Sequence, residues 1–411
     1  MKRLLTICIL VINASFIYAQ NDEAIVRKIA DNVLKNDNFA FEGVFNHQIY
    51  LSGKDIPDTV MVKIKSGYSG WYYVNGVLNM AMIDLGNFVN DEKYTNHAIQ
   101  QVSFGLDNFK YFEKRLATTN LRRVPFREVI SIRELDDCGA MGASVIDVYQ
   151  KTSKPELKTY IDRAANHITN IQERLIDGTL VRKGPNPMTL WADDLYMSVP
   201  FLARMGKLSG ENKYYDDAIL QVLNFTKYLW DPKEELYYHC YFDDLKRNGV
   251  AHWGRCNGWI MCAQVHLLNN LPVNYAKRDS IIKNLERQIV GISRYQNGDG
   301  LWHQVVDKND SYPESSCTAM FVYSIARAVN EGWIDKRYAS IALTGWEGLK
   351  NFMITPEGQM KDVCVGTGIQ NDLVFYYKRP AVLDDIHGIG SLIEAGIEVV
   401  KLKQKLNIRK L

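Results

Sequence analysis

Two pairs of adjacent aspartates are the residues best suited to chemistry in this sequence. Asp136 and Asp137 stand in "ELDDCG", and Asp193 and Asp194 stand in "TLWADD". Two carboxylates facing across a cavity can share acid/base work on a glycoside: one gives or takes a proton while the other positions water or shifts its neighbour's pKa. Successive side chains of a helix point about 100° apart. We therefore expect one aspartate of each pair to face the cavity and the other to cap or pair, and the spacing alone does not say which.

Aromatic residues stand close to these and other polar motifs. Trp71, Trp191 and Trp253 offer faces that suit the apolar side of a sugar ring, while Asp, Asn, His and Arg can hold its polar edges. Packing in the core is the alternative for any one tryptophan. The other aromatic residues placed in this way are Trp259, Trp302, Tyr196, Tyr238 and Tyr312.

The motif "HWGRCNGW" contains a second set of candidate residues. His252 can change its charge near neutral pH, and Arg255 is a fixed cation that can grip a carboxylate in a bidentate manner, with Asn257 beside them. A structural ion pair is the alternative for Arg255. By residue type alone, His239 in "YYHCYFDD" is typical of a packing residue.

Cofactor and metal motifs are absent from the sequence. It contains no GxxxxGK[ST], GxSxG or HExxH pattern, and its cysteines form neither CxxC pairs nor zinc-type spacings with histidine. We therefore expect no cofactor and no metal. The six cysteines that follow residue 19 are interpreted as buried thiols, with one incidental disulfide as the alternative: Cys138, Cys240, Cys256, Cys262, Cys317 and Cys364.

Residues 1–19, "MKRLLTICILVINASFIYA", have the pattern of a secretory signal peptide: two basic residues, an apolar stretch and a small-residue end. We expect an exported, periplasmic protein. Without Lys2 and Arg3, 47 basic and 47 acidic residues remain, which removes the electrostatic basis for nucleic-acid binding. No later segment is long and apolar enough to span a membrane, and the sequence does not indicate the oligomeric state.

Helices are predicted almost throughout the chain. Amphipathic stretches such as "YIDRAANHITNIQERLI" (160–176) alternate with stretches that are apolar on nearly all sides, such as "GWIMCAQVHLL" (258–268). The second kind recurs at intervals of about 60 residues. Each member follows a polar, aromatic or glycine-rich motif: "WYYVNG" (71–76), "ELDDCG" (134–139), "TLWADD" (189–194), "HWGRCNG" (252–258), "YPESS" (312–316) and "LDDIHG" (383–388).

This pattern predicts an all-α fold, an (α/α)6 toroid of six inner and six outer helices, as a single domain over residues 20–411. If the inner helices all run the same way, the six motifs converge at one end of the ring and line one cavity. Helix amino termini at that end favour an anionic ligand. The alternative for any single motif is that its Asp, Ser or Asn only caps the helix.

Four segments carry a resemblance to a known family: "TLWADDLYMSVPFLARMG", "YYHCYFD", "HWGRCNGW" and "ESSCTAMF", in that order. They resemble the unsaturated glycuronyl hydrolases, especially the unsaturated rhamnogalacturonyl hydrolases of glycoside hydrolase family 105, over about residues 25–400. The resemblance implies an (α/α)6 barrel that acts, without cofactor or metal, on lyase-generated oligosaccharides ending in a 4,5-unsaturated uronic acid. The implied reaction is hydration of a vinyl ether: an Asp protonates C4, water adds at C5, and the resulting hemiketal opens and releases the aglycone.

The resemblance also implies roles for single residues. Its W-x-D pattern makes Asp193 the catalytic acid/base, and "DDCG" supplies a second catalytic aspartate, Asp137, with Asp136 as the alternative. It matches His239 to an active-site histidine, and Trp253 with Arg255 to a clamp for the substrate carboxylate. The complete set of expected substrate-binding residues is Trp191, His239, His252, Trp253, Arg255, Asn257, Trp71 and Ser316.

Two other functions remain open on the same architecture. A sugar 2-epimerase generally needs a pair of histidines on facing helices, whereas carboxylates dominate the motifs here. A non-catalytic protein could keep the aromatic cavity and bind an oligosaccharide without turnover. Export fits polysaccharide breakdown better than either, so the expected partner is an unsaturated uronyl oligosaccharide.

Overall fold

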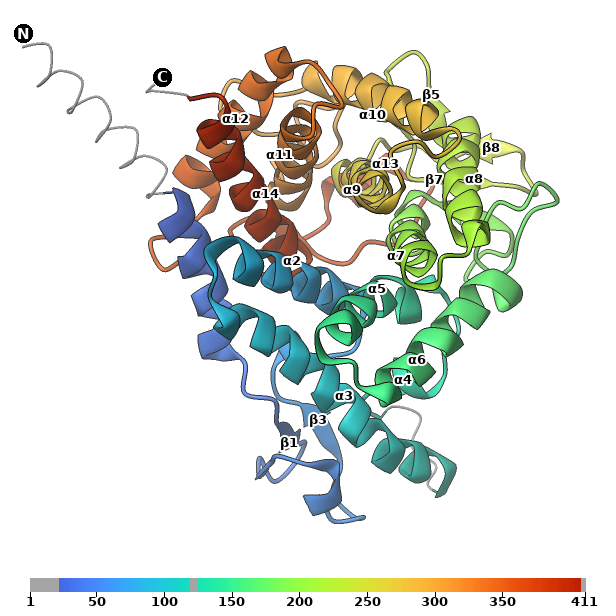
Figure 1. The fold of residues 1–411 in the computed structure, drawn as a ribbon, viewed down its shortest axis with the longest axis vertical. Coiled ribbons are helices and arrows are strands. Elements are labelled where there is room, and N and C mark those ends of the chain that lie inside the picture. The colour runs from blue at the N-terminus through green and yellow to red at the C-terminus, as the bar shows by residue number, and fades with distance from the viewer. Residues whose placement is uncertain (1–21, 119–123, 408–411) are drawn as a thin grey trace, which may run out of the picture.

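Two concentric rings of helices form the body of the protein (Figure 1). The computed structural model describes residues 22–118 and 124–407. Each inner helix packs against the next, and the last packs against the first, which closes the ring. The inner helices are α2 (Tyr73–Val89), α5 (Leu135–Thr152), α7 (Val199–Ser209), α9 (Gly254–Asn270), α11 (Ser315–Asn330) and α14 (Ile386–Lys405).

The outer helices are amphipathic, whereas the inner ones are buried nearly all round. In α9 every residue from Gly254 to Leu268 is buried, whereas the outer helix α8 (Asn212–Leu229) buries one face, which is mostly apolar. The prediction of an all-α (α/α)6 toroid is therefore confirmed. The outer helices are a helix over residues 22–36, α3 (Glu92–Thr118), α6 (Pro155–Asn166), α8 (Asn212–Leu229), α10 (Arg278–Ser293) and α12 (Ala339–Gly348).

The inner helices begin at or just after the six motifs, so these motifs share one end of the ring. Two of the motifs also cap their helices: Glu314 accepts hydrogen bonds from the amides of Ser316 and Cys317, and Asp385 accepts one from the amide of His387. These two motifs therefore cap their helices and also lie at the shared end of the ring, because the start of each inner helix is at that end.

The start of α7 differs from the expectation. The sequence predicts an inner helix directly after the motif "TLWADD" (189–194), but a 3₁₀ turn occupies Ala192–Leu195 and the α-helix begins at Val199. Pro200 explains the shift, because proline lacks an amide hydrogen and is favoured in the first turn of a helix. Asp193 and Asp194 therefore lie in a separate turn ahead of the helix.

The stretch 160–176 is also less helical than its periodicity predicts. The α-helix ends at Asn166, a π-turn follows over His167–Ile171, and the chain leaves the helix at Gln172. Arg174 donates to the carbonyl of Ile168 and pairs with Asp217 on α8, which draws the chain away from the helix axis.

Short strands and two short helices connect the rings, and the helical periodicity of the sequence did not predict them. The sheet that matters for function has the order β4-β7-β8 and pairs Trp191 with Cys240. It joins β4 (Thr189–Trp191), β7 (Cys240–Phe242) and β8 (Arg247–Asn248). The other elements are β1 (Phe41–Gly43), β2 (Ile49–Tyr50), β3 (Val62–Ile64), β5 (Trp230–Asp231), β6 (Leu236–Tyr237), β9 (Val363–Cys364), β10 (Ala381–Val382), α4 (Arg127–Ile130) and α13 (Leu373–Tyr377).

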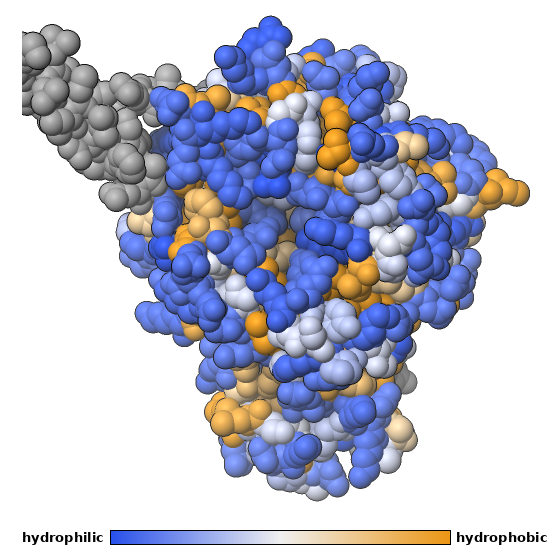
Figure 2. Space-filling model, viewed as in Figure 1, coloured by the Kyte–Doolittle hydropathy of each residue, from blue (hydrophilic) through white to orange (hydrophobic). Residues whose placement is uncertain are grey.

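Hydrophilic residues cover most of the face seen down the axis of the ring, and apolar residues appear there in scattered groups (Figure 2). All six cysteines of the described part are buried free thiols, so the alternative of a disulfide does not hold for them. Within residues 22–118 and 124–407, no helix is long and apolar enough to cross a membrane. The signal-peptide segment 1–19 lies outside the described residues, and export stays a prediction.

Close packing of the inner ring depends on glycines at helix contacts. A β-carbon on Gly76 of α2 would collide with the backbone of Ala140 in α5. We expect Gly76→Ala to lower the free energy of unfolding by about 1–3 kcal/mol, because two helix backbones would have to move apart. Urea denaturation measures this change.

Gly298→Ala is the matched control, because Gly298 is exposed and a β-carbon there would meet nothing within 4 Å. Equal stability of the two variants would contradict the close approach of α2 and α5.

Candidate active site

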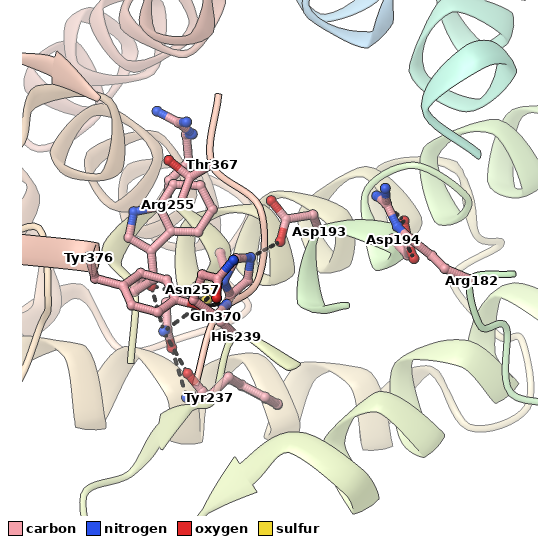
Figure 3. Close-up of polar contacts among 12 residues, drawn as sticks. Arg182, Asp193, Asp194, Tyr237, His239, Arg255, Asn257, Thr367, Gln370 and Tyr376 are labelled. Atoms are coloured by element: carbon pink, nitrogen blue, oxygen red, sulfur yellow. Dashed lines mark hydrogen bonds and ion pairs between the residues drawn. The ribbon is translucent and has the colours of Figure 1, made fainter. Parts of the chain in front are cut away.

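Asp193 and His239 form the central pair of the site. His239 Nε2 lies 3.0 Å from Asp193 Oδ2, and His239 Nδ1 lies 2.8 Å from the hydroxyl of Tyr376 (Figure 3). Strand pairing brings the two residues together: β4 lies against β7, and the amide of Ala192 donates to the carbonyl of His239. Asp193 follows that hydrogen bond directly, so its position is set by backbone contacts.

Each ring nitrogen of His239 has one hydrogen-bond partner. The hydroxyl of Tyr376 accepts a hydrogen bond from the amide of Gln370 and can donate its own hydrogen to His239 Nδ1. Nδ1 is then an acceptor, so Nε2 carries the hydrogen and donates it to the Asp193 carboxylate. In this arrangement both ring nitrogens are paired, and Tyr376 orients the imidazole ring.

The Asp193 carboxylate is held in its charged form. Burial tends to raise its pKa, but His239, followed by Arg182 and Arg255, outweighs burial and lowers the pKa below its usual value. The Asp193 side chain is 14% exposed, whereas that of Asp194 is fully buried. Of the two neighbours, only Asp193 is accessible to a ligand.

Asp194 points the opposite way, into an ion-pair network (Figure 3). Arg182 Nε lies 3.0 Å and its Nη2 lies 2.7 Å from the carboxylate oxygens of Asp194. The same guanidinium donates to Asp136 at 3.0 and 3.2 Å, and Tyr72 adds a hydroxyl hydrogen bond to Asp136. One cation thus joins a carboxylate from each aspartate pair.

Asp136, rather than Asp137, is the member of its pair that takes part in this network. Asp137 is completely buried, and its Oδ2 accepts a hydrogen bond from the amide of Arg133 at 2.8 Å. Burial raises the pKa of Asp137. Asp137, the expected second catalytic residue, thus lies outside the network, whereas its alternative Asp136 belongs to it, because the first turn of α5 directs the two side chains to different sides; the catalytic role of either aspartate stays a prediction.

Trp191 lies between the network and His239. The Arg182 guanidinium stacks on its ring at 4.0 Å, and its ring centre lies 6.0 Å from that of His239. The indole Nε1 is buried and has no hydrogen-bond partner.

Arg255 is placed close to the site but differently from the expected clamp. Its guanidinium is 1% exposed and donates to the carbonyls of Cys364 and Val365 and to the hydroxyl of Ser316. It also stacks on Trp253 at 4.6 Å. The structure therefore covers Arg255 with the 364–365 segment, where it supplies positive charge without offering an open bidentate grip.

Trp253 and Ser316 also support their surroundings. Trp253 donates from Nε1 to Gln304, and its ring centre lies 4.7 Å from that of His239, so it packs against this histidine from the protein side. Ser316 is fully buried and donates to the carboxylate of Glu314. Neither side chain is open to a ligand in this structure.

Two expected binding residues, Asn257 and Trp71, have structural roles instead. Asn257 is fully buried and bonds both the amide and the carbonyl of Tyr237, so it fastens β6 to α9. Trp71 is 2% exposed and donates to Tyr160 of the outer helix α6, which makes it a core residue. Gly105 on α3 leaves room for the indole ring of Trp71, which a β-carbon at that position would meet.

His252 belongs to a separate cluster. It lies 3.2 Å from Asp231 and 3.2 Å from Asp307, and its ring centre lies 4.4 Å from that of Tyr238. These carboxylates hold His252 in place, so the structure does not bring it into the pair formed by Asp193 and His239.

Sequence reasoning missed four residues that shape the site. Arg182 and Tyr376 stand in segments without a motif, and only the fold brings them to Asp194 and His239. Tyr73 and His387 lie within two of the motifs and share a hydrogen bond of 2.7 Å between the neighbouring helices α2 and α14. Their positions at the starts of α2 and α14 were a usable signal for this last pair.

Among the described residues, no group of three or more His, Cys, Asp or Glu is arranged to hold a metal ion. The polar side chains at the site instead form direct hydrogen bonds and ion pairs with one another. What the arrangement offers is a partly exposed carboxylate, oriented by a histidine, beside a network that keeps a second carboxylate fixed.

The sequence of the chain matches a known protein family. The model of Glycosyl Hydrolase Family 88 matches residues 49–403. The chain is 26% identical over 263 residues to the unsaturated rhamnogalacturonyl hydrolase YesR of Bacillus subtilis (strain 168), covering 63% of this chain and 73% of that protein. It is 28% identical over 176 residues to the unsaturated 3S-rhamnoglycuronyl hydrolase of Alteromonas sp. (strain LOR), covering 41% of this chain and 42% of that protein.

Solved structures show the same fold. The family 105 glycoside hydrolase of C. acetobutylicum ATCC 824 superimposes with a TM-score of 0.74 at 22% identity, covering 91% of this chain and 98% of that one. A possible member of the GH105 family from Salmonella enterica gives a TM-score of 0.73 at 24% identity, covering 93% and 94%. The resemblance found in the sequence is confirmed, and the epimerase and the non-catalytic binding protein are set aside: the chain belongs to Glycosyl Hydrolase Family 88 and is a glycoside hydrolase.

Proposed function

We propose that this hydrolase removes a 4,5-unsaturated uronic acid from the non-reducing end of lyase-generated oligosaccharides, with rhamnogalacturonan-type products as the preferred class. The observation that carries the proposal is the accessible Asp193 carboxylate, hydrogen-bonded to His239 at 3.0 Å. The family and the activities named for the relatives from Bacillus and Alteromonas support the substrate class.

Asp193 carries the proton in the proposed reaction. The acid form of Asp193 donates its proton to C4 of the C4–C5 double bond, and the resulting carboxylate then takes a proton from the water that adds to C5. The product is a hemiketal, which opens and releases the aglycone. His239 keeps the carboxylate oriented through both steps, so the same oxygen can give and then recover the proton.

The low pKa of Asp193 sets a condition on this reaction. In the free protein His239, Arg182 and Arg255 hold the group ionised, and an ionised group cannot protonate C4. A bound uronate adds a negative charge close to Asp193, and a like charge raises the pKa of a carboxyl group. Substrate binding therefore prepares the acid form that the first step needs.

Activity itself is tested by the ultraviolet absorbance of the unsaturated uronate. We expect the absorbance of rhamnogalacturonan lyase products to fall when the protein is added, because hydration removes the double bond. Lyase digests of glucuronate-bearing polymers, measured in parallel, rank the substrate classes. If no digest loses absorbance, the proposal is wrong.

The roles of the two adjacent aspartates are separable by isosteric substitution. We expect Asp193→Asn to lower kcat by about 10²–10⁴-fold, because it removes the acid, while stability changes little. Asp194→Asn keeps Asp193 and weakens the pair with Arg182, so we expect it to lower the free energy of unfolding by about 1–3 kcal/mol. Absorbance kinetics and urea denaturation measure the two effects. Near-normal activity of Asp193→Asn beside an inactive Asp194→Asn would reverse the assignment.

The pH dependence of kcat tests the coupling of Asp193 to His239. A general acid works while protonated, so kcat falls as the pH rises through the pKa of Asp193 in the complex. His239 lowers that pKa, so its removal raises it. We expect His239→Gln to reduce kcat and to move this fall to higher pH. Tyr376→Phe serves as the control, because it keeps the imidazole. If the fall of kcat stays at the same pH or moves to lower pH in His239→Gln, the coupling of Asp193 to His239 is contradicted.

A further inference from the structure

A second cavity lies at the opposite end of the ring from Asp193. Its volume is about 420 Å³, and its walls come from the carboxyl-terminal parts of inner helices, including Asp84 on α2, His266 on α9 and Arg327 on α11. Aromatic side chains separate it from the candidate active site: Tyr196 stacks on Trp259 at 4.5 Å, and the Tyr196 hydroxyl lies 3.3 Å from His266 Nε2. None of the reaction steps above uses this cavity.

The positive charges of this cavity are already matched by carboxylates. Arg204 Nε lies 2.9 Å from Asp147, and Arg327 and Lys401 lie 3.0 and 2.8 Å from Glu398. An anionic ligand would have to compete with these buried or half-buried pairs.

Two carboxylates lack such partners. Glu394 lines the cavity and is 3% exposed, and its buried Oε1 has no hydrogen-bond partner, with His266 Nε2 4.0 Å away. Asp84 is exposed to the cavity, and no hydrogen bond or ion pair to its carboxylate is found among the described residues. A buried, unpaired carboxylate is costly, so its retention in a cavity points to a ligand that pairs with it.

His266 does not supply the missing positive charge. Its Nδ1 accepts a hydrogen bond from Arg204 at 3.3 Å, and its Nε2 is 4.0 Å from Glu394, beyond hydrogen-bond distance. Burial, followed by the charges of Arg204 and Arg327, lowers the pKa of His266 well below its usual value. The imidazole is therefore neutral.

The helix ends that line the cavity are a second source of negative charge there. The carboxyl-terminal ends of the inner helices meet here, and helix dipoles place partial negative charge at those ends. Although Asp84 is accessible, the protein atoms around it raise its pKa to about 6, and the nearby Asp147 adds to this increase. Burial and Asp84 likewise raise the pKa of Glu394. A cation in the cavity would offset both effects.

We propose that this cavity binds a small organic cation whose primary ammonium group donates hydrogen bonds to Glu394 and Asp84. An ammonium group has three hydrogen-bond donors and no acceptor, so it can donate to both carboxylates at once. Phe88 and Ile397 provide apolar wall for an alkyl chain. The cavity far exceeds the size of a single metal ion, and the described residues provide no metal-type cluster.

Three ligands of similar shape and different charge test the proposal: butylammonium, butanol and butyrate. Ligand-observed NMR on the full chain gives the dissociation constant of each. We expect saturable binding of butylammonium and affinity for the other two lower by at least about tenfold, because only the cation pairs with the carboxylates. Equal binding of butanol would show an apolar cavity, and tighter binding of butyrate would show an anion site. Either result, or no binding of butylammonium, overturns the proposal.

Isosteric variants locate the binding. Asp84→Asn and Glu394→Gln should each weaken butylammonium binding by at least about tenfold, since each removes one charged acceptor. Glu357→Gln is the control, because Glu357 is exposed and the change removes the same charge elsewhere. Circular dichroism verifies folding, and Asp84→Asn, at an accessible position, carries the test if Glu394→Gln does not fold. Unchanged affinity in Asp84→Asn overturns the proposed contact.

Discussion

Most of the site depends on one buried guanidinium, that of Arg182. It binds Asp136 at the start of α5 and Asp194 in the turn before α7, and it covers the ring of Trp191. A buried charge without partners is strongly destabilising, so these three elements have to keep their relative positions. Because Arg182 holds Asp194 on one side, the neighbouring Asp193 is left to point toward His239. The orientation of Asp193 thus follows from an ion-pair network in which Asp193 itself takes no direct part.

The direction of the inner helices gives the two ends of the ring opposite electrostatic character. Amino termini meet at the end that contains Asp193, where Arg182 and Arg255 add positive charge and lower the pKa of that carboxyl group. Carboxyl termini meet at the other end, where neither Glu394 Oε1 nor the Asp84 carboxylate has a hydrogen-bond partner among the described residues, and the surrounding protein atoms raise the pKa values of both groups. A uronate and an ammonium ion are the ligands that complement these two environments.

The sequence predicted the fold well because its signal is periodic. Each inner helix is apolar on all sides and each outer helix on one side, and a ring is the arrangement that buries both. Boundaries were less predictable where tertiary contacts override periodicity. Pro200 delays the start of α7, and the pair between Arg174 and Asp217 draws the chain away from the helix after Ile171. The short strands carry too few residues for a period to show.

For the site, the sequence by itself determined which segments meet, because six motifs precede six parallel inner helices. It also limited each aspartate pair to one inward residue, and the resemblance selected Asp193. Only the tertiary structure decided that Asp136, rather than Asp137, joins the network, and that Arg255 and Asn257 support the backbone. It also brought in Arg182 and Tyr376, which lie far from their partners in the chain or outside any motif. The reason is that spacing along a helix defines a direction relative to its own axis, whereas a contact depends on what the neighbouring elements place in that direction.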